Sequence, residues 1–155
     1  MRCVFVAILL ACAPLTPAAA DVDDIDVSPL LECVEAAGRE TDALRACQGA
    51  VSAPCFDAPG GETTSGMVFC LGAEGGAWER VMAASLARLA AGNSALSPAL
   101  AQAQSAWSDY REAECSYRVA RWGLGSGARV TLAACYADLA ADRAISLVAY
   151  EAQAD

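Results

Sequence analysis

Apolar residues recur at helical spacing along most of the chain, and no segment after the first twenty residues alternates as a β-strand would. This pattern predicts two long helices, over residues 97–122 and 129–150, joined by a turn with three glycines. A third long helix is expected over 64–91, and two short helices over 30–37 and 41–51. We therefore predict an all-α fold, a small helical bundle that ends in a C-terminal helical hairpin.

The ends of these helices carry recognisable signals. Ser97 is expected to be the N-cap of its helix, with Pro98 at the first helical position. Pro54 is expected to end the second short helix, because a residue that precedes proline avoids the helical conformation. Residues 55–61, which include two consecutive glycines, are then expected to form a loop.

The first twenty residues have the organisation of a secretion signal. Arg2 is followed by an apolar run over 4–13 that is too short to span a membrane, and small residues lead up to Ala20. Cleavage after Ala20 would leave one domain, residues 21–155, in the periplasm or outside the cell. An alternative is a lipoprotein anchored through Cys12, since Leu-Leu-Ala-Cys resembles a lipobox. No segment after the leader is apolar for long enough to be a transmembrane helix.

Six cysteines remain after the leader, an even number that predicts three disulfides in an exported chain. Fifteen pairings are possible for six cysteines. The glycine turns favour pairing in sequence order, because each turn has one cysteine on either side. The expected pairs are Cys33 with Cys47, Cys55 with Cys70, and Cys115 with Cys135. Because the chain has neither a CxxC spacing nor histidine, we expect no zinc site, no redox site and no cofactor.

The charged residues narrow the range of functions. The net charge is −9, and every basic residue is arginine. Such a chain does not bind nucleic acid non-specifically, and its charge favours a basic protein partner. The absence of histidine and lysine excludes Ser-His, Cys-His and Schiff-base chemistry. The carboxylates form no recognisable catalytic pair, so we expect that the protein is not an enzyme.

Several polar and aromatic residues are candidates for a site. Glu74 falls within the apolar stripe of the helix over 64–91, where a carboxylate needs a partner. We expect it to pair with Arg111 or Arg143, either as an internal ion pair or as part of a ligand site. Of the three tryptophans, Trp122 precedes the last glycine turn and is the candidate for an exposed partner contact, whereas Trp78 and Trp107 are expected in the core.

Most of the chain after the leader resembles a known family. The segments that carry the resemblance are Gln104-x2-Trp107-x2-Tyr110-Arg111-x3-Cys115, Cys135 with Asp142-Arg143, and an upstream stretch from Gly61 to Glu79. They are similar to the lysozyme inhibitor LprI-like N-terminal domain. The chain departs from that pattern at Glu79, where aspartate is expected, at Ala83, where asparagine is expected, and at Ala140, where threonine is expected.

The resemblance implies an exported bacterial binding protein of the lysozyme-inhibitor type, with a c-type lysozyme as the expected basic partner. The alternative is a structural or stress-related module of the cell envelope that has no effect on lysozyme. The two hypotheses differ in what they predict for the surface, because the inhibitor needs an acidic face and the envelope module needs an exposed apolar patch.

Overall fold

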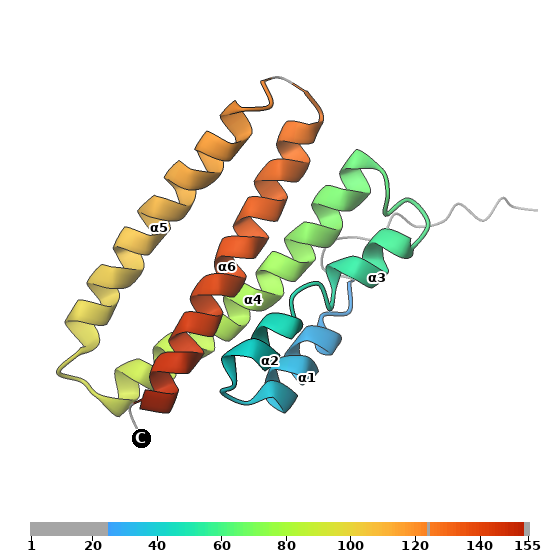
Figure 1. The fold of residues 1–155 in the computed structure, drawn as a ribbon. Coiled ribbons are helices and arrows are strands. Elements are labelled where there is room, and N and C mark those ends of the chain that lie inside the picture. Colours follow the sequence, from blue (N-terminus) through green and yellow to red (C-terminus); the bar gives the residue numbers. More distant parts are fainter. Residues whose placement is uncertain (1–24, 124, 154–155) are drawn as a thin grey trace, which may run out of the picture.

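The computed structural model describes residues 25–123 and 125–153, and its elements within these ranges are all α-helices (Figure 1). The helices are α1 (Ser28–Ala37), α2 (Thr41–Ala46), α3 (Ser52–Asp57), α4 (Thr64–Gly92), α5 (Ser97–Ala120) and α6 (Gly127–Gln153). The predicted all-α fold with a C-terminal helical hairpin is confirmed. The expected signal peptide, its cleavage after Ala20 and the alternative at Cys12 lie outside the described residues. Among the described helices, none is both long and apolar enough to cross a membrane.

The three long helices lie side by side, with α6 between α4 and α5, and α1 to α3 pack beside α4 and α6 (Figure 1). Helices α4 and α6 run parallel, because the first half of α4 meets α6 at Ala137 and the second half meets it at Glu151. Helix α5 runs antiparallel to both. The α4–α6 pair therefore forms the centre of the fold, and α5 lies at its edge.

Small residues allow the two central helices to approach closely. Alanines at both helices are fully or nearly fully buried, and a Cβ added to Gly75 would lie 3.3 Å from the Cα of Ala137. The largest buried side chain is Trp78 of α4, and α1 and α2 contribute Leu30 and Leu44 to the same core. Helix α5 contributes little: Cys115 is the one buried residue among its 24.

All three disulfides join cysteines that are consecutive in the sequence, as predicted. They link α1 to the end of α2, α3 to α4, and α5 to α6, with Cα–Cα distances of 5.6–5.7 Å. The pairs are Cys33–Cys47, Cys55–Cys70 and Cys115–Cys135. Each disulfide closes a short loop and is worth about 3 kcal/mol through the entropy of the unfolded chain. The three bonds are distributed over the molecule and do not mark a single face.

The structure corrects two local expectations. Residues 52–57 form helix α3 where the sequence predicted a helix end and a loop. Proline is tolerated there because Pro54 lies in the first turn, where a backbone N–H has no helical acceptor. Ser97 is the first residue of α5, and the N-cap position belongs to Leu96, whose side chain cannot cap. The hydroxyl of Ser97 instead donates to the carbonyl of Ala90 across the turn between α4 and α5.

Candidate functional site

Glu74 is buried, but its partners differ from those that the sequence predicted. Its carboxylate accepts hydrogen bonds of 2.9–3.0 Å from the backbone N–H groups of Gly49, Val51 and Ser52. The carboxylate also accepts a hydrogen bond of 2.9 Å from Nε1 of Trp78, one turn further along α4. The prediction that Glu74 pairs with an arginine is therefore wrong, because four N–H donors occupy both of its oxygens.

The position of these donors explains why the carboxylate can be buried. Val51 and Ser52 are the N-cap and first residue of α3, whose first N–H groups have no acceptor inside the helix. A negative charge at that end is stabilised by the helix dipole as well as by the hydrogen bonds. Glu74 thus fastens the start of α3 to the middle of α4. This is a structural role, and no oxygen of Glu74 is left to bind a ligand.

Arg111 connects the three long helices. From α5, one of its guanidinium nitrogens lies 2.6 Å from Oε1 of Glu79 on α4. The same guanidinium stands over the ring of Trp107, 4.7 Å from its centroid, and over that of Tyr136 on α6, at 5.1 Å. A planar cation that stacks on two rings and binds a carboxylate holds α5 in one position relative to α4 and α6.

Gln104 forms a second connection about two turns earlier on α5. Its side-chain oxygen accepts a hydrogen bond of 3.0 Å from Nε of Arg143 on α6. Its side-chain nitrogen donates to Sδ of Met82 on α4 at 3.4 Å. Gln104, Trp107 and Arg111 therefore lie together on the inner side of α5, where Gln104 meets Arg143 of α6. Their contacts are with other helices of the same chain, so this cluster fixes the position of α5.

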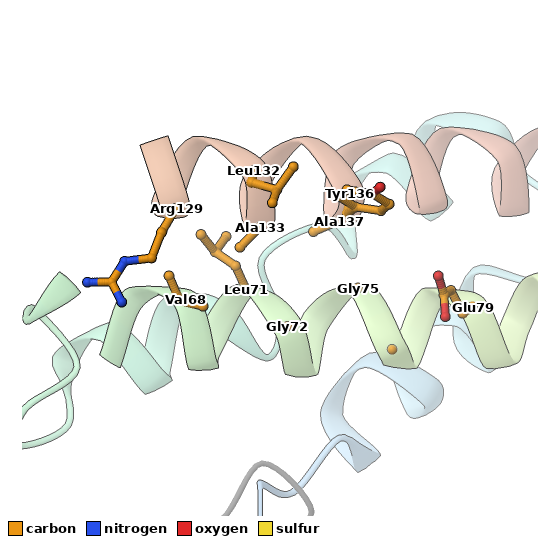
Figure 2. A pocket seen from close by; sticks show the side chains of 11 residues that line it. Val68, Leu71, Gly72, Gly75, Glu79, Arg129, Leu132, Ala133, Tyr136 and Ala137 are labelled. Carbon is orange, nitrogen blue, oxygen red and sulfur yellow. The ribbon is translucent and has the colours of Figure 1, made fainter. Parts of the chain in front are cut away.

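A groove opens between α4 and α6 on one side of this cluster (Figure 2). Its volume is about 460 Å³, and its walls are mostly apolar, with Leu71 of α4 and Leu132 of α6 among them. Figure 2 shows Arg129 near one end and Glu79 near the other. The two charged side chains bound an apolar trough.

Two glycines of α4 form part of the groove wall. A Cβ added to Gly72 or Gly76 would meet no atom within 4 Å, so helix packing does not require glycine at either position. Gly75, between them, is the residue that lies against Ala137. Glycine inside a helix costs up to about 1 kcal/mol relative to alanine. The chain thus carries two glycines that keep the groove open at the expense of helix stability.

A second concavity, of about 820 Å³, lies where the end of α6 meets the turn between α4 and α5. At the edge of this concavity, Nε of Arg88 donates a hydrogen bond of 2.8 Å to Oε2 of Glu151. Glu151 is only 8 % exposed. Burial alone would raise the pKa of Glu151, but hydrogen bonds from Arg88 and Ser85 outweigh it and hold that pKa below its usual value. This pair joins the C-terminal end of α6 to α4.

Two acidic residues, Asp138 and Asp142, lie one turn apart on α6 near Arg118 of α5. Burial raises the pKa of Asp138, Arg118 on α5 lowers it, and the neighbouring Asp142 raises it again, with a net increase. Arg118 lies 3.7 Å from Asp138 and 2.9 Å from Glu114. Burial is the largest cause of the raised pKa of Asp138, and the repulsion from Asp142 makes a smaller contribution.

Comparison with known families identifies the chain. The family model described as lysozyme inhibitor LprI matches residues 55–147, which include α4, α5 and most of α6. The chain belongs to the LprI family. No curated protein and no solved structure matches it. The match confirms the resemblance found from the tryptophan-to-cysteine segment, and it covers the two C-terminal disulfides.

The LprI pattern residues that the sequence singled out lie in different places. Gln104, Trp107 and Arg111 lie on the inner side of α5, where the departure at Glu79 retains a carboxylate for Arg111. Glu74 lies against the start of α3, and Tyr110 is exposed.

Trp122 is 57 % exposed after the end of α5. Its ring lies over Gly127, where a Cβ would come within 2.7 Å of it. Trp122 is thus both accessible and fixed in position.

Sequence reasoning did not predict the groove. The signal was the spacing of Gly72, Gly75 and Gly76, which was compatible with either a close helix approach or a kink. Gly75 allows the close approach of α6, whereas Gly72 and Gly76 border open space. In the part of the chain that the structure describes, no group of three or more His, Cys, Asp or Glu could hold a metal ion.

Proposed function

We propose that this chain is an exported bacterial binding protein that binds and inhibits a basic lysozyme of the c type. The observation that carries the proposal is the LprI match over residues 55–147. Three disulfides suit an oxidising compartment outside the cytoplasm, and a net charge of −9 favours encounter with a basic enzyme.

The C-terminal hairpin offers two features that suit such a partner. Asp138 and Asp142 repel each other on the outer side of α6, so a lysine or arginine of the partner would lower the energy of both. Trp122 presents an exposed aromatic ring at the end of the hairpin, and tryptophan is among the residues that contribute most to binding energy at interfaces. We propose that the hairpin contacts the enzyme through these residues.

The experiment is lysozyme activity on a cell-wall suspension, with and without the oxidised protein from Asp21 to Asp155, at low and moderate salt. We expect dose-dependent inhibition that weakens with salt, since exposed charges are screened. The variant Asp138→Asn/Asp142→Asn is expected to weaken inhibition by about tenfold, equivalent to about 1.4 kcal/mol. The control Glu32→Gln/Glu35→Gln removes the same charge from α1 and is expected to leave inhibition nearly unchanged.

Trp122→Ala tests the aromatic contact, with Tyr150→Ala as the control because Tyr150 is an exposed aromatic residue at the other end of α6. Unchanged lysozyme activity at both salts, together with no complex on a sizing column, would overturn the proposal. The protein would then be better described as a cell-envelope module whose partner is another envelope protein.

A further inference from the structure

The groove between α4 and α6 has an apolar body and a positive end. Leu71 of α4 and Leu132 of α6 line its length. Arg129 lies near one end and Glu79 near the other (Figure 2). The carboxylate of Glu79 is already bound by Arg111. Arg129 is exposed, and its guanidinium forms no ion pair or hydrogen bond with another residue that the structure describes.

The parallel arrangement of α4 and α6 adds to the positive charge at this end. Arg129 is the third residue of α6, and Val68, which lines the groove near it, is the fifth residue of α4. Both helices therefore begin at this end of the groove, and their dipoles present their positive ends there. The effect of a helix dipole is strongest in the first turn, which in α6 includes Arg129. An anion is favoured at this end, whereas the ion pair of Glu79 neutralises the other.

The body of the groove suits an extended chain of methylene groups. A Cβ at Gly72 or Gly76 would meet no atom within 4 Å, so the α4 wall is open along about one turn. The volume of about 460 Å³ is within the range of small-molecule sites, and α4 rises about 16 Å between Val68 and Glu79. Leu132 is 39 % exposed on the opposite wall, and an apolar chain in the groove would shield it from water.

We propose that this groove binds a single-chain fatty acid, with the carboxylate at Arg129 and the acyl chain along Leu71 and Leu132 toward Glu79. The proposal is separate from lysozyme inhibition and rests on charge complementarity. A carboxylate can accept two parallel hydrogen bonds from a guanidinium, whereas a neutral chain leaves Arg129 unused and a cationic head is repelled by it. The net charge of −9 repels anions at long range, so a preference for an anionic head must come from local positive charge.

Calorimetric titration of the oxidised protein with decanoate, decanol and decylamine at neutral pH tests the proposal. The three probes share one apolar chain and differ in the charge of the head group. We expect decanoate to bind with one molecule per protein and about fivefold more tightly than decanol, because an exposed ion pair and a helix N-terminus each contribute modestly. Adsorption to the acidic surface would instead favour decylamine. Octanoate should bind about fourfold more weakly than decanoate, since its chain has two fewer half-buried methylene groups.

Arg129→Gln tests the position of the head group. The variant is expected to lose most of the preference for decanoate and to bind decanol as the wild type does. Arg80→Gln is the matched control, because it removes the same charge from an exposed position of α4 outside the groove. It should leave the preference nearly unchanged.

Gly72→Leu/Gly76→Leu tests the acyl chain, because the two side chains would fill the groove. It is expected to weaken decanoate at least tenfold. Ala83→Leu/Ala87→Leu adds the same side chains at the same spacing on an exposed part of α4, and should have little effect. Both Cβ positions at the glycines are open, so the groove-filling variant should retain the stability of the wild type in thermal unfolding.

Decanoate that binds no more tightly than decanol would overturn the proposal. So would a preference for decanoate that survives in Arg129→Gln, or binding that a stably folded Gly72→Leu/Gly76→Leu leaves unchanged. None of these measurements involves lysozyme, so their outcome is independent of whether the chain inhibits that enzyme.

Discussion

Nε1 of Trp78 donates a hydrogen bond of 2.9 Å to Oε1 of Glu74, one turn earlier on α4. Both residues are buried. The remaining contacts of the carboxylate are the backbone N–H groups of Val51 and Ser52 at the start of α3 and that of Gly49 in the preceding turn. The Glu74 carboxylate thus accepts hydrogen bonds both from the indole N–H of Trp78 and from the backbone N–H groups at the start of α3. A feature that could have indicated a ligand site is in this chain an internal anchor.

Replacement of Glu74 is expected to destabilise the protein severely. Glu74→Ala leaves four N–H donors without an acceptor, three of them buried, and we expect a loss of about 4 kcal/mol in the free energy of unfolding. Glu74→Gln keeps the shape but brings an N–H₂ group toward N–H donors, and should cost about 2 kcal/mol. Urea unfolding of the oxidised protein measures both. Glu32→Gln, at an exposed position on α1, is the control and should change stability very little.

Alanine at Gly72 or Gly76 is expected to stabilise the protein. Neither Cβ would meet another atom within 4 Å, so each substitution gains helix propensity of up to about 1 kcal/mol without a clash. Gly66→Ala is the contrasting variant, because its Cβ would collide with the backbone of Gly60 and Gly61. Thermal unfolding of the three variants checks the order. Equal destabilisation by all three would show that the groove wall is packed more tightly than the structure indicates.

Arg111→Ala is expected to loosen α5 more than the rest of the fold. The substitution removes a carboxylate contact and the stacking on Trp107 and Tyr136, with an expected cost of about 1–2 kcal/mol. Arg111→Lys should restore only part of this, since an ammonium group cannot stack as a plane. Hydrogen exchange resolved by peptide is the measurement, and the loss of protection should concentrate in α5. Arg121→Ala, at an exposed position just after α5, should leave that protection unchanged.

The Arg88–Glu151 pair predicts a dependence of stability on pH. The pKa of Glu151 is lower in the folded protein than in the unfolded chain, so the ionised carboxylate stabilises the fold. That contribution is fully present above the unfolded pKa and is lost as the pH falls through the folded pKa. The stability difference between the wild type and Glu151→Gln should therefore shrink in acid. Arg88→Met should reduce the same difference at neutral pH, and a difference that grows in acid would contradict the assignment.

Local features of the sequence were sufficient to predict much of the fold. Helical periodicity located the three long helices, and the glycine turns with one cysteine on either side predicted the pairing of Cys33 with Cys47, Cys55 with Cys70, and Cys115 with Cys135. These predictions hold because the determining interactions lie within about twenty residues of one another. Helix α3 was missed because a proline in a first turn resembles a proline that ends a helix.

The sequence by itself determined that the chain is helical, acidic, disulfide-bonded and without histidine or lysine. Its motif residues also identified the LprI family. Only the tertiary structure decided which groups Glu74 binds, that α4 and α6 run parallel, and that Gly72 and Gly76 leave a groove open. The physical reason is that a buried carboxylate binds the donors that packing brings within about 3 Å, and those donors lie on segments that sequence spacing does not relate to it.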